Sequence, residues 1–230
     1  MAVKNKSIVL IGSTSETAEF NNYLLAAGFK ASLAASTRNS PDAHIVFDFR
    51  SDASAETFDF YKSLNADLLF INAAFTCVWQ LKATCPKIKF PVIGFNGLPT
   101  LFKPAAPELS AANDEDYAAA ETMLQTIGAK PLRVADRTGL AMPRLVSMII
   151  NEAYYTLQEG TATAEDIDLS MKLGTNYPYG PFDWGQKIGL SNVVRVLDSV
   201  YTDTHDERYR ICPLLKKEAA LISRNLLRLA

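Results

Sequence analysis

Two stretches decide the fold of this chain: Ala164-Glu-Asp-Ile-Asp-Leu-Ser-Met-Lys-Leu-Gly174 and Tyr177-Pro-Tyr-Gly-Pro-Phe182. Thr163 precedes the first stretch and Asp166 follows three residues later, which is the pattern of a capping box at the start of a helix. We expect this helix to end at Gly174, because glycine adopts the left-handed conformation beyond a helix end at little cost. The second stretch then forms a loop that leads into another helix.

The rest of the second half is also helical in character, and strand patterns stop after Asp136. The expected helices span residues 143–158, 163–174, 182–188, 192–201 and 214–229. Gly189 is expected to end the third helix and Ser191 to cap the fourth. The helix from Pro143 is apolar nearly all round, so its own domain or a second subunit must cover it. We therefore expect an all-helical domain over residues 137–230.

The first half alternates short apolar strands with helices. The expected strands span residues 7–11, 31–35, 44–49, 66–74, 92–95 and 131–135, and the expected helices span residues 15–27, 54–64 and 115–127. Such alternation requires crossover connections, which indicate a parallel sheet with helices on both faces. Residues 1–136 are therefore predicted to form a doubly wound α/β domain, so the fold class is α/β followed by all-α.

Composition and charge narrow the functional classes. The 230 residues are 48% hydrophobic and 21% charged, with a formal net charge of -2, so neither nucleic acid nor an anionic membrane is expected as a partner. The apolar run from Ile8 to Ile11 is too short for a signal-peptide core or a membrane span. Cys77, Cys85 and Cys212 lack metal-ligand spacing, which favours reduced thiols in the cytoplasm and no metal site.

The order and spacing of motifs in the second half carry a family resemblance. Together with Ile150-Asn-Glu-Ala, Ile188-Gly-Leu and Cys212-Pro-Leu-Leu215, the two quoted stretches resemble the C-terminal domain of short-chain 3-hydroxyacyl-CoA dehydrogenases of the 3-hydroxybutyryl-CoA dehydrogenase type. The resemblance implies a helical dimerisation domain, similar to the C-terminal domain of 6-phosphogluconate dehydrogenase, and hence a homodimer. It also implies an acyl-CoA-like small-molecule ligand, NAD or NADP as cofactor, and a place in fatty acid metabolism.

The first half resembles a shortened, eroded form of that family's Rossmann-like dinucleotide-binding domain. Ser7-Ile-Val-Leu-Ile-Gly12 matches the first strand and glycine, and Asp42-Ala-His-Ile-Val-Phe-Asp48 matches a strand with a carboxylate at its end. Ile93-Gly-Phe-Asn96 matches the strand that leads to the family's catalytic histidine. Between the second strand and the Asp48 strand only a few residues remain, where the family carries a strand and a helical hairpin that clamps the CoA nucleotide.

The turn that binds the dinucleotide in the family is altered here. It reads Gly12-Ser-Thr-Ser-Glu-Thr17, so only the first of three glycines is kept. The glycines allow the backbone to approach the pyrophosphate at a helix N-terminus. Thr14 and Thr17 stand at the second and third glycine positions and crowd that approach. Glu16 adds a negative charge where a phosphate lies in the family.

Several other groups remain candidates for contacts with the cofactor. The hydroxyls of Ser13, Thr14 and Ser15 can donate hydrogen bonds to a phosphate. Asp48 lies at the edge where such sheets bind ligands and can anchor a ligand, or it can be a satisfied strand-end carboxylate. Asn72 lies in the fourth expected strand, where the resemblance places a further cofactor contact.

The choice between NAD and NADP rests on the end of the second strand. Ala35 replaces the carboxylate that binds the ribose of NAD in the family. Ser36, Thr37 and Arg38 follow and weakly resemble a site for the 2′-phosphate of NADP. The alternative is that they form a solvated turn.

The catalytic positions implied by the resemblance are mostly replaced. Asn96 stands at the position of the histidine that removes the proton, and Glu108, twelve residues later, stands at that of the glutamate that orients it. An asparagine amide can donate a hydrogen bond but cannot act as a base. Glu108 can be the base itself, or it can be an exposed loop carboxylate after Pro107. Ala74 replaces the substrate-binding serine, and Pro143 replaces the asparagine that opens the first C-terminal helix.

Two functions are compatible with these residues. The first is a divergent NAD(P)-dependent oxidoreductase acting on a 3-hydroxyacyl-CoA-like substrate, with Asn96 and Glu108 in the polar roles. The second is a catalytically silent homodimeric scaffold that binds a nucleotide, an acyl-CoA or a protein partner. The deciding feature is whether the space near Gly12 and Asn96 is open to a dinucleotide or filled by Thr14, Thr17 and their neighbours.

Overall fold

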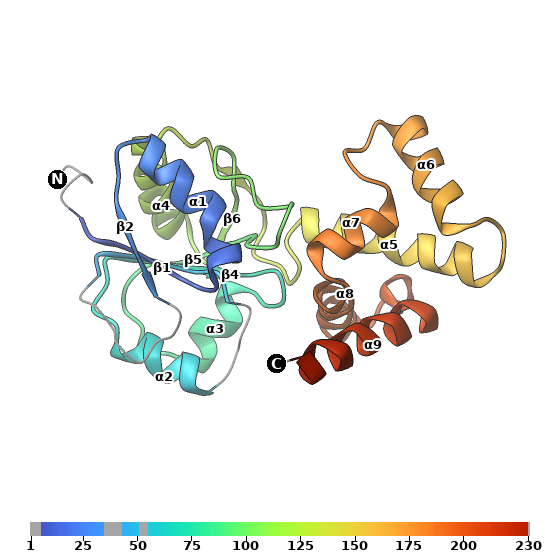
Figure 1. The fold of residues 1–230 in the computed structure, drawn as a ribbon. Coiled ribbons are helices and arrows are strands. Elements are labelled where there is room, and N and C mark those ends of the chain that lie inside the picture. The colour runs from blue at the N-terminus through green and yellow to red at the C-terminus, as the bar shows by residue number, and fades with distance from the viewer. Residues whose placement is uncertain (1–5, 35–42, 51–54, 230) are drawn as a thin grey trace. The chain divides into compact units, whose positions relative to one another are not determined.

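The computed structural model describes residues 6–34, 43–50 and 55–229 (Figure 1). The chain divides into two compact units, Met1–Leu140 and Ala141–Ala230. The first unit is an α/β unit and the second is helical, which confirms the fold class expected from the sequence. Ala35, which replaces the ribose-binding carboxylate, and Ser36, Thr37 and Arg38, the candidate 2′-phosphate contacts, lie outside the described residues.

The first unit is built on one mixed sheet with strand order β2-β1-β3-β4-β5-β6-β7. The strands are β1 (Ile8–Ile11), β2 (Ala31–Ala34), β3 (Ile45–Asp48), β4 (Leu68–Asn72), β5 (Val92–Phe95), β6 (Glu108–Ala111) and β7 (Leu132–Arg133). All neighbouring strands run parallel except β5 and β6, which are antiparallel. The sequence suggested a parallel sheet, but the observed sheet is mixed because β5 and β6 are antiparallel. Strand β6 was not predicted, because four residues between a proline and a helix cap carry too little periodicity.

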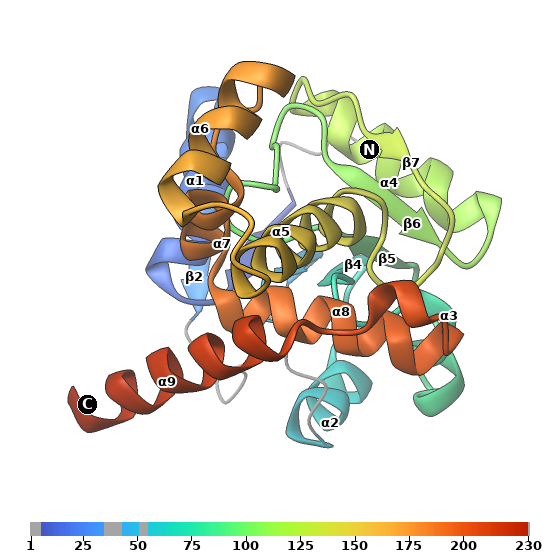
Figure 2. The ribbon, with the colours of Figure 1, turned by 90° about the vertical axis from the view of Figure 1, so that its right-hand side faces the viewer.

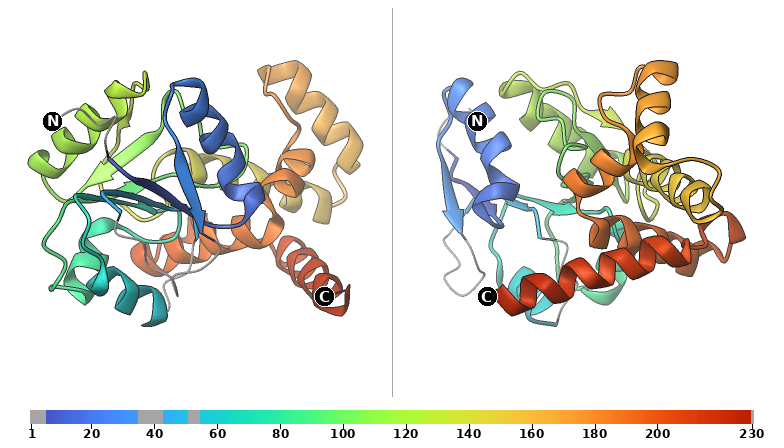
Figure 3. Two further views of the ribbon diagram at one scale, coloured as in Figure 1. Left: turned by 60° about the vertical axis from the view of Figure 1, so that its left-hand side comes forward. Right: turned by 45° about the vertical axis from the view of Figure 1, so that its right-hand side comes forward.

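Helices cover both faces of this sheet (Figures 1 and 3). They are α1 (Thr14–Ala26), α2 (Ala55–Ser63), α3 (Val78–Thr84) and α4 (Asp114–Thr126). Ile8 and Leu10 of β1 belong to the core shared with α1 and α4, whereas Val9 and Ile11 belong to the core shared with α2 and α3. This alternation follows from the two-residue period of a strand, and it makes every residue of β1 apolar.

Helix α3 was also absent from the sequence-based prediction. Its first residue follows Cys77, whose side chain provides no cap. Instead the carboxylate of Asp136 accepts hydrogen bonds from the backbone N–H groups of Val78 (2.8 Å) and Trp79 (2.9 Å). A carboxylate stabilises a helix N-terminus through these bonds and through the helix dipole. Because Asp136 lies far along the chain, no local pattern reveals this helix.

The second unit is arranged around α5, which packs against α6, α7, α8 and α9 (Figure 2). Its helices are α5 (Met142–Gln158), α6 (Ala164–Thr175), α7 (Pro181–Ile188), α8 (Leu190–Thr204) and α9 (Pro213–Leu229), with a 3-10 turn η2 (Glu207–Tyr209). Two predicted helix ends were wrong. Helix α6 continues through Gly174 and ends before Asn176, which adopts the left-handed conformation, and α8 begins at Leu190, so Ser191 lies inside its first turn.

Asn151 explains one motif of the helical unit. It lies within α5 and is 4% exposed. Its side-chain Nδ2 donates to the carbonyl of Arg210 (2.9 Å), and its Oδ1 accepts from the backbone N–H of Cys212 (2.8 Å). A buried amide that satisfies two backbone groups fixes the segment that leads into α9. The Asn151 amide therefore ties the Ile150-Asn-Glu-Ala motif to the segment that begins Cys212-Pro-Leu-Leu215.

Asp168 links the two stretches quoted first. The carboxylate of this α6 residue accepts hydrogen bonds from the backbone N–H groups of Phe182 (2.7 Å) and Asp183 (3.0 Å), at the N-terminus of α7. Gly180 precedes that helix, and a Cβ atom at this position would collide with the Asp168 side chain. The Gly-Pro-Phe sequence is thus matched to an aspartate twelve residues earlier, in the preceding helix.

Replacing Gly180 by alanine should therefore destabilise the helical unit. We expect Gly180→Ala to lower the free energy of unfolding by about 2 kcal/mol, because the added methyl group must displace a capping carboxylate. The matched control is Gly174→Ala, since a Cβ at Gly174 meets nothing within 4 Å. That control should be neutral or stabilising by about 0.5–1 kcal/mol. Urea unfolding followed by circular dichroism measures both, and equal effects would contradict this account.

Candidate functional site

The candidate site lies at the carboxyl edge of the sheet. The strand order reverses around β1, because β2 and β3 pair on opposite sides of it. In doubly wound sheets ligands bind outside the carboxyl ends of the strands at such a reversal. Gly12 follows β1 and Asp48 ends β3, while Asn72 ends β4 and Asn96 follows β5. The structure therefore places these four predicted site residues along one edge.

The turn after β1 is closed by the chain's own side chains. Ser13 caps α1, and its backbone N–H and its hydroxyl both donate to Oε2 of Glu16 at 2.7 Å. The backbone N–H of Glu16 donates in return to the Ser13 hydroxyl oxygen at 3.3 Å. This is a complete capping box. The N–H groups of Ser13 and Glu16 are thus engaged within the turn at the helix N-terminus, where such folds bind a phosphate.

The space beside Gly12 is also filled. Gly12 has a φ of 151°, and a Cβ placed there would lie 3.2 Å from Glu16 Oε2, 3.2 Å from Phe49 Cβ and 3.3 Å from Thr17 Cγ2. Thr17 is 1% exposed, whereas Thr14 is exposed and does not fill this space. Thr17, at the third glycine position, therefore crowds the turn as the sequence suggested, and Thr14 does not.

A small cavity lies beside this turn. It measures about 140 Å³ and lies between α1 and the loop after β5. Its lining residues are Ser15, Glu16, Glu19, Gly97, Leu98, Pro99, Thr100 and Phe102. Sites for drug-sized ligands usually enclose roughly 300–1,000 Å³. This cavity is smaller than such sites, and the carboxylates of Glu16 and Glu19 line it.

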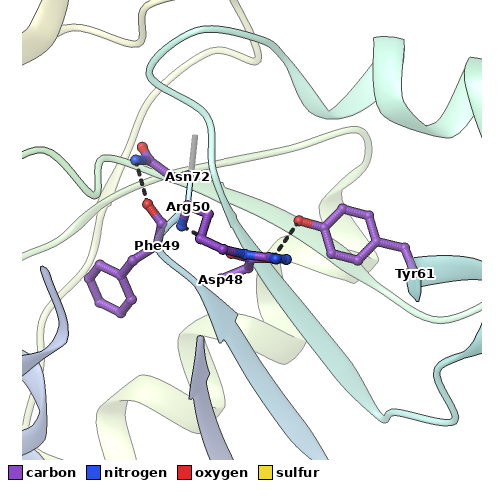
Figure 4. Close-up of polar contacts among 5 residues, drawn as sticks. All are labelled: Asp48, Phe49, Arg50, Tyr61 and Asn72. Carbon is purple, nitrogen blue, oxygen red and sulfur yellow. Dashed lines mark hydrogen bonds and ion pairs between the residues drawn. The ribbon is translucent and has the colours of Figure 1, made fainter. Parts of the chain in front are cut away.

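Asp48 forms a buried ionic network (Figure 4). Its side chain is fully buried, and its Oδ1 accepts from the backbone N–H and from Nε of Arg50, both at 2.9 Å. Its Oδ2 accepts from Nη2 of Arg50 (2.5 Å) and from the Tyr61 hydroxyl (3.0 Å). Sequence reasoning missed both partners. Arg50, two residues after a strand-end aspartate, gave a weak local signal, whereas Tyr61 on α2 gave none.

Asn72 is committed to the backbone of three strands (Figure 4). Its Nδ2 donates to the carbonyl of Phe49 (3.0 Å), and its Oδ1 accepts from the N–H groups of Gly97 (3.0 Å) and Ala74 (3.3 Å). A Cβ at Gly97 would lie 2.9 Å from Asn72 Cγ, so only glycine allows this approach. Asn72 therefore orders the edge on which the site is built.

Asn96 and Glu108 are brought together by strand pairing. The antiparallel ladder pairs Phe95 with Leu109, so the next step along it places Asn96 opposite Glu108. Opposite residues in such a ladder have Cα atoms about 4.5–5.5 Å apart. Glu108 is only 8% exposed and begins β6. The alternative that it is an exposed loop carboxylate is therefore wrong, because β6 holds it between β5 and β7.

Asn96 retains an unused donor. The residue is 1% exposed, and its Oδ1 accepts from the backbone N–H of Leu98 at 3.2 Å. That bond fixes which end of the amide is the oxygen. Its Nδ2 has no hydrogen-bond partner within the described residues. Ala74, at the position of the family's serine, is fully buried and offers no polar side chain. The edge therefore holds a buried donor where the resemblance implies a base.

Two other features of the chain bear on its class. None of the helices in the described ranges combines the length and apolar character that a bilayer crossing requires. Across those same ranges, no group of three or more histidine, cysteine or acidic side chains is arranged to hold a metal ion.

Pro143, at the position where the resemblance implies an asparagine, occupies the first turn of α5 and is buried.

Sequence comparisons match the helical unit. Residues 129–221 match the family model described as 3-hydroxyacyl-CoA dehydrogenase, C-terminal domain. The chain is 46% identical over 100 residues to 3-hydroxyadipyl-CoA dehydrogenase of Escherichia coli, which covers 44% of this chain and 21% of that protein. It is 34% identical over 107 residues to 3-hydroxybutyryl-CoA dehydrogenase of Bradyrhizobium diazoefficiens, which covers 46% of this chain and 36% of the relative. The matches thus span well under two thirds of either relative.

Structural comparisons extend over both units. The crystal structure of (S)-3-hydroxybutyryl-CoA dehydrogenase from Ralstonia eutropha has a TM-score of 0.75 at 20% identity and covers 94% of each chain. At that identity the likeness shows the fold alone. The structure of 3-hydroxybutyryl-CoA dehydrogenase from Escherichia coli has a TM-score of 0.60 at 34% identity and covers 69% of this chain and 33% of that one.

The fold is a Rossmann-like unit followed by a helical domain. The helical unit is a 3-hydroxyacyl-CoA dehydrogenase C-terminal domain, and the family resemblance expected from the sequence is confirmed. The resemblance to that family supports a nucleotide as the class of cofactor.

The Asp48 network should contribute strongly to stability. We expect Asp48→Asn to lower the free energy of unfolding by about 3 kcal/mol, because it leaves the Arg50 guanidinium without its buried counter-charge. Asp67→Asn is the matched control, since Asp67 pairs with Lys6 at 2.8 Å while its side chain is 53% exposed. Exposed pairs contribute about 0–1 kcal/mol. Urea unfolding measures both losses, and a loss at Asp48 no larger than at Asp67 would refute the assignment.

Proposed function

We propose that this chain is a homodimeric relative of the 3-hydroxyacyl-CoA dehydrogenases that binds an acyl-CoA-like ligand without dehydrogenating it. The observation that carries the proposal is the buried Asn96 amide at the end of β5, which has an unused Nδ2 and lies opposite Glu108. The family resemblance suggests an acyl-CoA-like ligand. The Asn96 amide is the reason to expect no catalysis, because it cannot act as a base.

The absence of a base at Asn96 argues against the parent reaction. Oxidation of a hydroxyl group requires a group that accepts its proton, and losing a positioned base typically costs roughly 10²–10⁴-fold in rate. An amide nitrogen carries no basic lone pair at neutral pH. Neighbouring Ala74 cannot take over the proton either. The Asn96 amide is therefore suited to donating a hydrogen bond to an oxygen atom of a ligand rather than to removing hydrogen from it.

The same amide gives a physical reason for binding. A buried donor without a partner costs about 1–3 kcal/mol, and a ligand oxygen that accepts from it recovers much of that cost. A thioester or 3-oxo carbonyl oxygen is a neutral acceptor. It suits a position that also faces the carboxylate of Glu108, whereas an anionic ligand group would be repelled there. An acyl carbonyl is thus the ligand group that best matches Asn96 Nδ2.

A second candidate function is a divergent NAD(P)-dependent oxidoreductase on a 3-hydroxyacyl-CoA-like substrate. The observation that favours it is the position of Glu108 directly across the ladder from Asn96. In this alternative Glu108 accepts the hydroxyl proton while Asn96 donates to the substrate oxygen. The closed turn at Gly12 and Glu16 counts against it.

Acetoacetyl-CoA binding distinguishes the two functions. We expect the protein to bind acetoacetyl-CoA in isothermal titration calorimetry and to oxidise no NADH or NADPH in its presence. Asn96→Asp keeps the Oδ1 acceptor for Leu98 and replaces the Nδ2 donor with an oxygen, so binding should weaken by at least about tenfold. Asn22→Asp, on the exposed face of α1, makes the same change of charge and should leave binding unchanged.

Two outcomes would overturn the proposal. Unchanged binding in Asn96→Asp would remove Asn96 from the site. Steady reduction of acetoacetyl-CoA that Glu108→Gln abolishes would establish the oxidoreductase instead.

The homodimer is proposed on the apolar surface of the helical unit. Leu145 of α5 is 58% exposed, and Leu169 and Leu173 of α6 are 56% and 78% exposed. Apolar side chains this exposed on a domain that serves dimerisation in its family favour a covered interface.

The buried cysteines Cys77, Cys85 and Cys212, which form no disulfide, support a proposed location in the reducing cytoplasm.

Light scattering during size-exclusion chromatography tests the dimer. We expect the wild-type chain to elute with the mass of two copies. Leu173→Glu should weaken the dimer by at least about tenfold, because it places a charge in an apolar contact. Leu33→Glu is the control, since Leu33 of β2 is 55% exposed but lies in the first unit. A monomeric wild-type chain, or equal effects of the two changes, would contradict the proposal.

A further inference from the structure

The Glu16 carboxylate occupies the part of the fold that is best suited to bind an anion. The N-terminus of a helix carries a partial positive charge and unpaired N–H groups, which together attract phosphates. Helix α1 begins at this point directly after the first strand, as in a dinucleotide-binding fold. Here the anion that sits on Ser13 is a side chain of the same helix, with both contacts at 2.7 Å.

The three side chains that surround Gly12 differ in how firmly the fold holds them. Phe49 is 1% exposed, and its ring packs against Phe20, Phe95 and Phe102 in the aromatic core. Thr17 is buried, and its hydroxyl donates to the carbonyl of Ser13 at 3.0 Å. Glu16 is only partly buried. It is therefore the one of these side chains whose removal leaves the core intact.

We propose that Glu16 is an internal anion that takes the place of a dinucleotide phosphate, and that it excludes NAD and NADP from this unit. The Glu16 carboxylate takes the N–H and the hydroxyl of Ser13, and it repels a phosphate that approaches the same helix N-terminus. The intramolecular carboxylate is attached to the helix and needs no encounter, so it has a high effective concentration. Glu19 lines the adjacent cavity and adds a second negative charge there.

This inference is independent of the acyl ligand proposed above. It concerns only the nucleotide side of the edge, so its test uses ADP-ribose, which contains the pyrophosphate and no acyl group, together with NADH. Failure of acetoacetyl-CoA to bind would leave it untouched. Binding of ADP-ribose to the wild-type chain would overturn it whether or not the acyl ligand binds.

Three variants of the full chain distinguish the effect of the Glu16 negative charge from the effect of the space that its side chain fills. Glu16→Gln keeps an acceptor that can complete the capping box and removes only the charge. Glu16→Ala removes both the charge and the side chain from the space beside Gly12. Glu19→Ala is the matched control, because it removes a carboxylate that lines the same cavity but makes no contact with Ser13 in the hydrogen bonds described. Circular dichroism checks that each variant is folded.

The titrations follow ADP-ribose by calorimetry and NADH by its fluorescence. We expect no saturable binding to the wild-type chain or to Glu19→Ala. Glu16→Ala should bind both ligands at least about tenfold more tightly than the wild-type chain, with Glu16→Gln between the two. Saturable sub-millimolar binding by the wild-type chain would overturn the proposal. So would a Glu16→Ala variant that is folded and binds no better than the wild-type chain, because the exclusion would then lie elsewhere.

Discussion

The side-chain amide of Asn72 holds the ends of the three central strands together. It donates to the carbonyl that follows β3 and accepts from the backbone N–H that follows β5, while it stands at the end of β4 itself. Buried polar groups are stable only when they are paired, and this amide pairs three backbone groups at once. The positions of Asp48 and Asn96 depend on it, because each lies within one residue of a group that Asn72 binds. Gly97 is fixed by the same contact.

Most polar groups at this edge are used to stabilise the protein itself. Asp48 is paired with the Arg50 guanidinium and accepts a hydrogen bond from the Tyr61 hydroxyl, and Glu16 completes the cap of α1. In a sheet that binds a dinucleotide, the corresponding groups remain available to the ligand. Here the donor of Asn96 is left over, opposite the carboxylate of Glu108. The chemistry that remains is hydrogen bonding to a neutral oxygen, and this is why we infer binding rather than hydride transfer.

The helical unit shows the same use of polar side chains, with a different consequence. Asp168 caps α7 and requires a glycine at position 180, and Asn151 fixes the backbone at Arg210 and Cys212. These contacts join the motifs that carry the family resemblance. The motifs therefore hold the helical domain together through contacts that lie within that domain.

The sequence by itself determined the class of fold, most helices and strands, and the positions that matter at the sheet edge. Apolar runs and glycine or serine caps act within a few residues, so a local pattern is sufficient for them. It did not determine α3 or β6, because Asp136 and the neighbouring strands stabilise them from far along the chain. Only the tertiary structure decided that Glu108 is buried opposite Asn96 and that Asp48 is bound to Tyr61. Hydrogen bonds and burial between distant residues leave no periodic signal in the chain, and they set what each polar group at the site can do.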